Sequence, residues 1–278
     1  MKIGAHVSAA GGLHNAPQNA AEEKLECFQM FSRPPQGGPA PKLGPDEIRL
    51  FEEAMAERGF DECYVHTPYV LNLAHKEKAT RRRTVGIIRT DLDRATLLGC
   101  PSIMTHLGSA SGIGDEALGR ELVAEGVTAI LDGYAGTARL LLEISAGAGM
   151  IIGDRFEEMA EILDRVGDER VGICFDTAHA FASGYDLRDE AAVQATLKEF
   201  DRHIGLDRLE LTHINDSKVE LGTRKDRHEH IGEGHIGQAG FEALMRQPAF
   251  ARINWILETP DDRSGDVKLL KKMRDQIL

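Results

Sequence analysis

Six short apolar segments of this 278-residue chain end in a side chain that can bind a metal ion. Those side chains are His66, His106, Glu143, Asp176, His213 and Glu258. Imidazole nitrogens and carboxylate oxygens are the donors that zinc and manganese take in proteins. One such residue at a strand end is ordinarily a hydrogen-bonded polar group, but six in series indicate a common site. Carboxylates that converged there without a cation would repel one another and take up protons.

Two short motifs add three donors to this set. In Asp176-x-x-His179 a second donor follows the first into the next loop. In Asp226-Arg227-His228 the outer two side chains point to one side of an extended chain, and Arg227 points to the other. A tetrahedral ion needs about four ligands, so nine donors with bridging carboxylates suit two or three ions. The sequence therefore predicts a multinuclear metal site.

The elements that must position these donors recur regularly. Eight apolar segments follow one another at intervals of roughly 36 residues, which is room for a strand, a returning helix and two loops. Most are continuously apolar, which is typical of strands buried on both faces of a parallel sheet. We expect strands at residues 3–7, 27–31, 63–67, 102–107, 140–145, 171–176, 209–214 and 253–258.

Amphipathic helices are predicted between these strands. Apolar residues recur at helical spacing in residues 82–98, 121–131, 156–166 and 191–200, and Gly167 is a stop signal after the third. The alternation predicts an α/β protein, a (β/α)₈ TIM barrel formed as one domain by residues 1–278, with its active site at the C-terminal ends of the strands. An open, doubly wound sheet of the same elements is the alternative.

Composition limits the classes of protein. The chain carries 33 Lys and Arg against 45 Asp and Glu, a formal charge of −12, which argues against a generally basic nucleic-acid coat protein. Its four cysteines form no Cys-x-x-Cys pair, and we expect buried thiols rather than disulfides. No apolar run reaches the roughly 18 residues of a membrane span, and residues 1–6 lack signal-peptide features. We expect a cytoplasmic protein with no membrane partner.

Five longer segments resemble the signatures of endonuclease IV, the zinc-dependent apurinic/apyrimidinic endonuclease family of base-excision repair. They are residues 4–12, 65–69, 174–181, 213–218 and 226–234. The resemblance extends from Lys2 to about Pro260. It implies a xylose-isomerase-like barrel with three metal ions, which are Zn²⁺, with Mn²⁺ at one position in some members.

The resemblance also implies a role for each donor. His66, His106 and Glu143 would hold one ion. Glu143 would bridge to a second ion, which also takes Asp176, His213 and Glu258. His179, Asp226 and His228 would hold the third. The implied catalytic residues are Glu143, Glu258 and Arg227, and the implied DNA contacts are Tyr69, Val70, Arg33, Gln36 and Arg227.

The implied activity is hydrolysis of the phosphodiester bond 5′ to an abasic site, by a water that two of the ions activate. The products would be a 3′-hydroxyl and a 5′ deoxyribose phosphate. The implied partner is double-stranded DNA with an abasic site or a 3′ blocking group, bound by a monomer. Cations and helix N-termini at one end of the barrel would give an acidic protein a positive DNA-binding mouth.

Three positions depart from the family pattern. Ile144 and Ala148 stand where the family carries amide side chains, which bears on how firmly Glu143 is oriented. Gln36 stands where a basic residue often enters the DNA, and the alternatives are weaker binding by this loop or substitution by Arg33. The alternative function is a divalent-metal sugar isomerase or epimerase on the same barrel, which would leave His179, Asp226 and His228 without a role.

Overall fold

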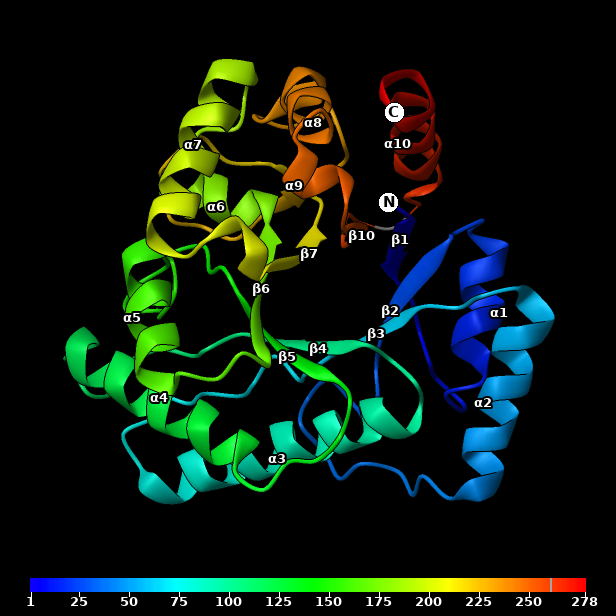
Figure 1. Ribbon diagram of the computed structural model, residues 1–278, viewed down its shortest axis with the longest axis vertical. Coiled ribbons are helices and arrows are strands. Elements are labelled where there is room, and N and C mark those ends of the chain that lie inside the picture. The colour runs from blue at the N-terminus through cyan, green and yellow to red at the C-terminus, as the bar shows by residue number, and fades with distance from the viewer. Residues whose placement is uncertain (261) are drawn as a thin grey trace.

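Eight parallel strands form a closed barrel in the computed structural model, which describes residues 1–260 and 262–278 (Figure 1). The strands are β1 (Ile3–His6), β2 (Cys27–Phe31), β3 (Cys63–His66), β4 (Ser102–Thr105), β5 (Arg139–Glu143), β6 (Val171–Asp176), β7 (Leu209–His213) and β10 (Asn254–Leu257). Neighbours in the chain are neighbours in the sheet, and β10 closes it by pairing with β1. The predicted barrel is confirmed, and the open sheet is excluded.

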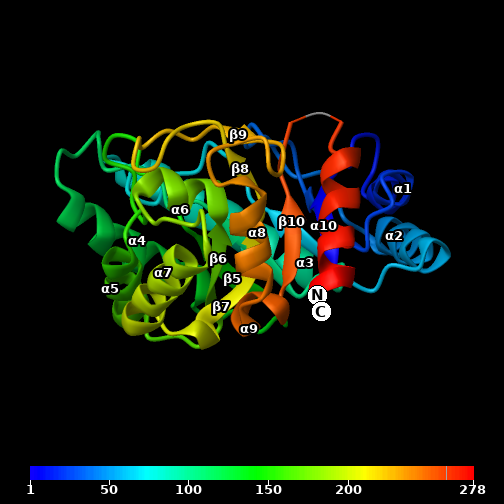
Figure 2. The same cartoon turned by 90° about the horizontal axis from the view of Figure 1, so that it is seen from above.

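Helices surround this barrel on the outside (Figures 1 and 2). They are α1 (Asn15–Glu22), α2 (Pro45–Arg58), α3 (Lys78–Leu97), α4 (Glu116–Leu131), α5 (Phe156–Val166), α7 (Glu190–His203), α8 (Gly237–Met245) and α10 (Ser264–Ile277). Shorter elements lie in the connections: α6 (Thr177–Ser183), η1 (Leu206–Arg208), α9 (Pro248–Ala251) and the hairpin of β8 (Asp216–Ser217) with β9 (His228–Glu229). None of the described helices is long and apolar enough to cross a bilayer.

Helix starts differ from expectation more than helix ends. Helix α5 has the predicted bounds, whereas α4 begins at Glu116 rather than at residue 121. The Asp115 side chain caps α4 by accepting a hydrogen bond from the Leu118 N–H at 3.1 Å. This first turn is largely exposed and its one large apolar residue, Leu118, faces outward, so the spacing of buried apolar residues does not reveal it.

The core has two parts. Aromatic and aliphatic side chains, among them Phe28, Phe175 and Trp255, are buried in a large cluster between strands and helices. A smaller cluster contains Cys27, Tyr64, Met104, Leu141, Cys174, Leu211 and Ile256, one from each of seven strands. Since side chains alternate across a strand, this second set points the other way, into the barrel. All four cysteines are buried and free, as expected.

Candidate metal centre

Six of the nine candidate metal ligands lie in the next layer of the barrel interior. In each of the seven strands that supply the small cluster, the residue two positions further on belongs to the site. Because side chains alternate along a strand, these residues lie directly above the small apolar cluster, at the carboxyl ends of the strands. The layer consists of Gln29, His66, His106, Glu143, Asp176, His213 and Glu258, and His6 of β1 completes the ring.

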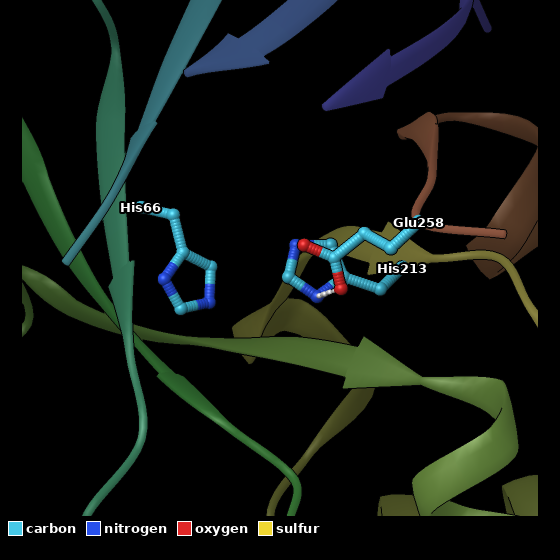
Figure 3. A group of neighbouring side chains, drawn as sticks. All are labelled: His66, His213 and Glu258. Atoms are coloured by element: carbon cyan, nitrogen blue, oxygen red, sulfur yellow. Dashed lines mark ion pairs between the residues drawn. The ribbon is translucent and has the colours of Figure 1, made fainter. Parts of the chain in front are cut away.

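Glu143 lies at the junction of two groups of donors. Its carboxylate is fully buried, with Oε2 3.0 Å from His66 Nε2 and 3.5 Å from His106 Nδ1. Its Oε1 lies 2.9 Å from His213 Nδ1. The ligand atoms of His66, His106 and Glu143 are mutually within 4.8 Å, and so are those of Glu143, Asp176, His213 and Glu258. Figure 3 shows His66, His213 and Glu258 converging from separate strands, with His213 and Glu258 paired at 3.3 Å.

A third group forms above β6. His179 lies in the first turns of α6, and His228 begins β9. His179 Nε2 lies 3.3 Å from Asp226 Oδ2, and His228 Nε2 lies 3.2 Å from Asp226 Oδ1. Asp176, His179 and His228 again lie within ligand distance of one another. The structure thus brings all nine donors together in three adjoining groups.

Backbone carbonyls orient the imidazoles of the third group. The Nδ1–H groups of His179 and His228 donate to the carbonyl oxygens of Ile144 (2.9 Å) and Glu258 (3.2 Å). Both Nε2 atoms are buried without a hydrogen-bond partner among the described residues. A buried, unpartnered imidazole nitrogen aimed at carboxylates is the arrangement of a metal ligand, since a cation satisfies both. These residues therefore fit a divalent ion.

The pKa values of the site residues depend on burial and on the charged side chains next to them. Burial alone would raise the pKa values of Glu143 and Glu258, but the surrounding imidazoles hold both well below the ordinary range. Burial lowers the pKa of His106, which keeps that imidazole neutral and able to donate a lone pair. Against the effect of burial, nearby carboxylates raise the pKa of His179 to about 10 and that of His228 to about 9.

These raised pKa values predict proton release on metal binding. Without metal, His179 and His228 hold protons below pH 9, and a cation must displace them to reach Nε2. The affinity of this group for Zn²⁺ should therefore rise with pH, up to roughly tenfold per pH unit for each proton displaced. Calorimetric titration of chelated protein in buffers of different ionisation enthalpy measures the protons. The variant His228→Asn should release fewer, and equal release would contradict this assignment.

Three of the expected DNA contacts, Gln36, Tyr69 and Val70, are exposed on two loops that pack against each other, and we call this group the wedge. Tyr69 and Val70 are 58% and 64% exposed, although both are large apolar residues. A Cβ on Gly37 would lie 2.8 Å from Val70 Cγ2, so the loop of Gln36 and Gly37 packs against the loop after β3. Gln36 is exposed beside this contact, and Arg227 is exposed on the segment between β8 and β9.

Arg33 is buried away from the exposed wedge, and its position in the structure does not favour the expected DNA contact. Its side chain is 5% exposed, and its Nε donates to Asp91 Oδ1 at 2.7 Å. A second nitrogen donates to the Ile87 carbonyl. Withdrawing the guanidinium would leave the buried Asp91 carboxylate without its counter-charge, so Arg33 ties the loop after β2 to α3 instead.

The departures at Ile144 and Ala148 do not disturb the donors. The Ile144 backbone carbonyl accepts from His179 Nδ1, and its N–H donates to the Cys174 carbonyl at 3.1 Å. Any side chain at this position supplies those backbone groups. Ala148 is exposed, and Glu143 contacts imidazoles directly rather than through amides.

Four polar residues of the site were not among the predicted site residues. Asn215 donates to Asp176 Oδ2 and accepts from the Glu258 N–H, each at 2.8 Å. Asp216 accepts from the backbone N–H groups of Gly232 (2.9 Å) and Gly234 (3.1 Å) and holds the loop after His228. The other two are His6 and Gln29. A polar residue within the apolar segment at 27–31 was the available signal for Gln29.

Comparison with known proteins decides the family. The family model described as a xylose isomerase-like TIM barrel matches residues 17–277. A "Probable endonuclease 4" from Carboxydothermus hydrogenoformans is 39% identical over 279 residues, covering 100% of this chain and 98% of that protein. The chain belongs to the endonuclease IV family. The crystal structure of endonuclease IV from Thermus thermophilus superposes with a TM-score of 0.88 at 30% identity, over 99% of this chain and 100% of that one.

The endonuclease IV fold is shared more widely. A D-tagatose 3-epimerase-like protein superposes with a TM-score of 0.77 over 100% of this chain and 98% of its own, at 20% identity. Identity at that level indicates a common barrel and nothing about the reaction.

Proposed function

We propose that this endonuclease IV family member is a metal-dependent DNA-repair hydrolase that cuts the phosphodiester bond 5′ to an abasic site in double-stranded DNA. The products are a 3′-hydroxyl and a 5′ deoxyribose phosphate. The observation that carries the proposal is the convergence of nine donors in three adjoining groups at the mouth of the barrel. Every donor comes from this one chain, which supports action as a monomer.

Each group has the donors for one divalent ion, and zinc suits the mixture of imidazole and carboxylate, with manganese as a substitute at one position. The sets are His66, His106 and Glu143; Glu143, Asp176, His213 and Glu258; and His179, Asp226 and His228. When bound, such ions supply a nucleophilic water at neutral pH and stabilise negative charge on phosphate oxygens. Glu143 belongs to two sets, so its carboxylate fixes the spacing between them.

A cavity of about 600 Å³ lies beside the third group. His106, His179 and Asp226 line its polar side, and Ala146 and Ile151 line its apolar side. Tyr69 and Val70 of the wedge stand at its edge. Extruding a nucleotide costs least where no base is stacked, so a cavity next to the donors favours an abasic deoxyribose over an intact nucleotide.

The polar groups around the mouth suit a phosphate backbone despite the net charge of −12. Lys225 and Arg227 are exposed on the segment that leads to His228. The Arg227 side chain donates to the neighbouring Asp226 carbonyl at 2.6 Å and remains accessible to a phosphate. Helices that follow parallel strands begin at this end of the barrel, and their N-termini favour anions.

A sugar isomerase or epimerase fits these features less well. Such an enzyme has no use for a third group of His179, Asp226 and His228, or for an exposed apolar wedge.

Incision of a defined duplex tests the proposal. The zinc-loaded protein should cut a duplex that carries one abasic-site analogue at a single bond, and a polymerase should extend the new 3′ end. The same duplex without the analogue should remain intact. Failure to cut with zinc and manganese supplied, or interconversion of ketohexoses, would overturn the proposal.

Removing the wedge should weaken substrate binding without affecting metal content. Stacking of an aromatic side chain on bases contributes about 1–3 kcal/mol, so Tyr69→Ala with Val70→Ala should raise KM for the abasic duplex by roughly 10- to 100-fold. The measurement is steady-state incision together with zinc analysis. Leu97→Ala is the matched control. Leu97 is likewise an exposed apolar residue (52%), but it lies at the C-terminal end of α3, away from the wedge. A wild-type KM in the double variant would show that the wedge does not touch DNA.

A further inference from the structure

Two members of the interior ring, His6 and Gln29, are not among the nine donors. Gln29 is fully buried, and its amide contacts three site residues. Its Nε2 lies 2.7 Å from Glu258 Oε1 and 2.8 Å from His6 Nδ1. Its Oε1 lies 2.8 Å from His213 Nε2. One side chain of β2 thus connects donors on β7 and just after β10.

These contacts permit only one orientation of the amide. The Glu258 carboxylate can only accept a hydrogen bond, so the NH₂ group of Gln29 must face it. The second N–H of that group then donates to His6 Nδ1. The amide oxygen is left to accept a hydrogen bond from His213 Nε2–H. A flipped amide would set oxygen against the carboxylate and NH₂ against the N–H of His213.

We propose that Gln29 is a positioning residue that holds His213 and Glu258 in the geometry required to bind the second metal ion. The inference rests on the proposed function, which supplies that ion. Gln29 directs Nε2 of His213 away from the site, so that Nδ1 faces Glu143 at 2.9 Å and Asp176 at 3.9 Å and could offer its lone pair to an ion bound between them. Gln29 donates a hydrogen bond to Glu258 Oε1. The other carboxylate oxygen, Oε2, therefore faces the second set of donors, 3.3 Å from His213 Nδ1.

His6 anchors this amide from the other side. Its ring packs on Phe31 with centroids 4.4 Å apart, and its Nδ1 takes the second N–H of Gln29. Both amide hydrogens and the oxygen are therefore satisfied in a fully buried position. Loss of the amide would leave His213 Nε2–H unpaired inside the barrel and free Glu258 to rotate.

The test compares Gln29→Met with wild-type zinc-loaded protein. Methionine keeps the length of the side chain but makes none of the three hydrogen bonds. Release of one zinc ion to a chromogenic chelator should become roughly 10- to 100-fold faster, as for other residues that orient ligands. Nitrogen NMR of the His213 ring should lose the pattern of a single Nε2–H tautomer. The kcat for incision should fall while KM for the duplex changes little.

Cys27→Ala is the matched control, because Cys27 lies two residues earlier on β2 and faces the same barrel interior. It should lower Tm yet keep the wild-type zinc release and the His213 signal. If Gln29→Met does not fold, His6→Phe removes one anchor nearer the surface and should speed release severalfold. Wild-type release in the folded variants would overturn the inference.

The two proposals fail separately. Zinc release and NMR require no DNA, so absence of incision by the wild-type protein would overturn only the proposed function. Normal incision by the wild-type protein with unchanged zinc release in Gln29→Met would overturn only the role of Gln29.

Discussion

Glu143→Gln should lower the rate of incision by about 10³-fold or more while the protein stays folded. The amide keeps the shape of the carboxylate but removes the charge shared by two donor groups. In the wild-type protein His66 faces one carboxylate oxygen of Glu143 and His213 faces the other. The glutamine amide has only one oxygen and cannot serve both. Loss of several kcal/mol of charge stabilisation corresponds to a change of this size. Single-turnover incision, zinc analysis and circular dichroism measure the three quantities.

Glu158→Gln is the control for that substitution. Glu158 is also a buried glutamate, 4% exposed, but it pairs with Arg120 and Arg155 on the outside of the barrel. Its loss should reduce stability and leave incision close to wild type. Near-normal incision by Glu143→Gln would show that Glu143 does not bridge two ions.

Removal of the metal ions should abolish incision and destabilise the protein. Without cations, the buried carboxylates and imidazoles of the three groups lack their principal partners. An ion present at about 1,000 times its Kd stabilises the folded state by about 4 kcal/mol. For a chain of this length that predicts a loss in Tm of roughly 10 °C or more on complete chelation.

Metal replacement gives the stoichiometry. Zinc should restore both incision and Tm, with close to three ions bound per chain, and manganese should replace part of it. Magnesium should restore neither, because it prefers oxygen ligands and five of the nine donors are imidazoles. Fewer than two bound ions, or no recovery with zinc, would contradict the trinuclear proposal.

Much of the barrel was predictable because its signals are local. Strands buried on both faces are continuously apolar, and α5 has an amphipathic period and a glycine at its C-cap, so their bounds were close to expectation. The donors were predictable for a topological reason, since the carboxyl ends of all parallel strands meet at one end of a barrel.

Arg33 has a buried partner that the sequence did not reveal. A basic residue on a loop beside a proposed DNA site suggests a phosphate contact, but its partner Asp91 lies 58 residues away on α3. The same limit hid Gln29, whose contact with Glu258 spans 229 residues. Only the helix packing in the first case and the barrel closure in the second bring these groups together.

The sequence by itself predicted the barrel, the nine candidate donor residues and the end of the barrel where they gather. Alternation along the strands also sets the layer, since each of the six donors at the end of a barrel strand follows a residue of the small apolar cluster by two positions. Only the tertiary structure decided which nitrogen faces which oxygen, which residues orient them, and that Arg33 is withdrawn. Periodicity describes one strand at a time, whereas those contacts depend on the register between strands and on the closure of β10 against β1.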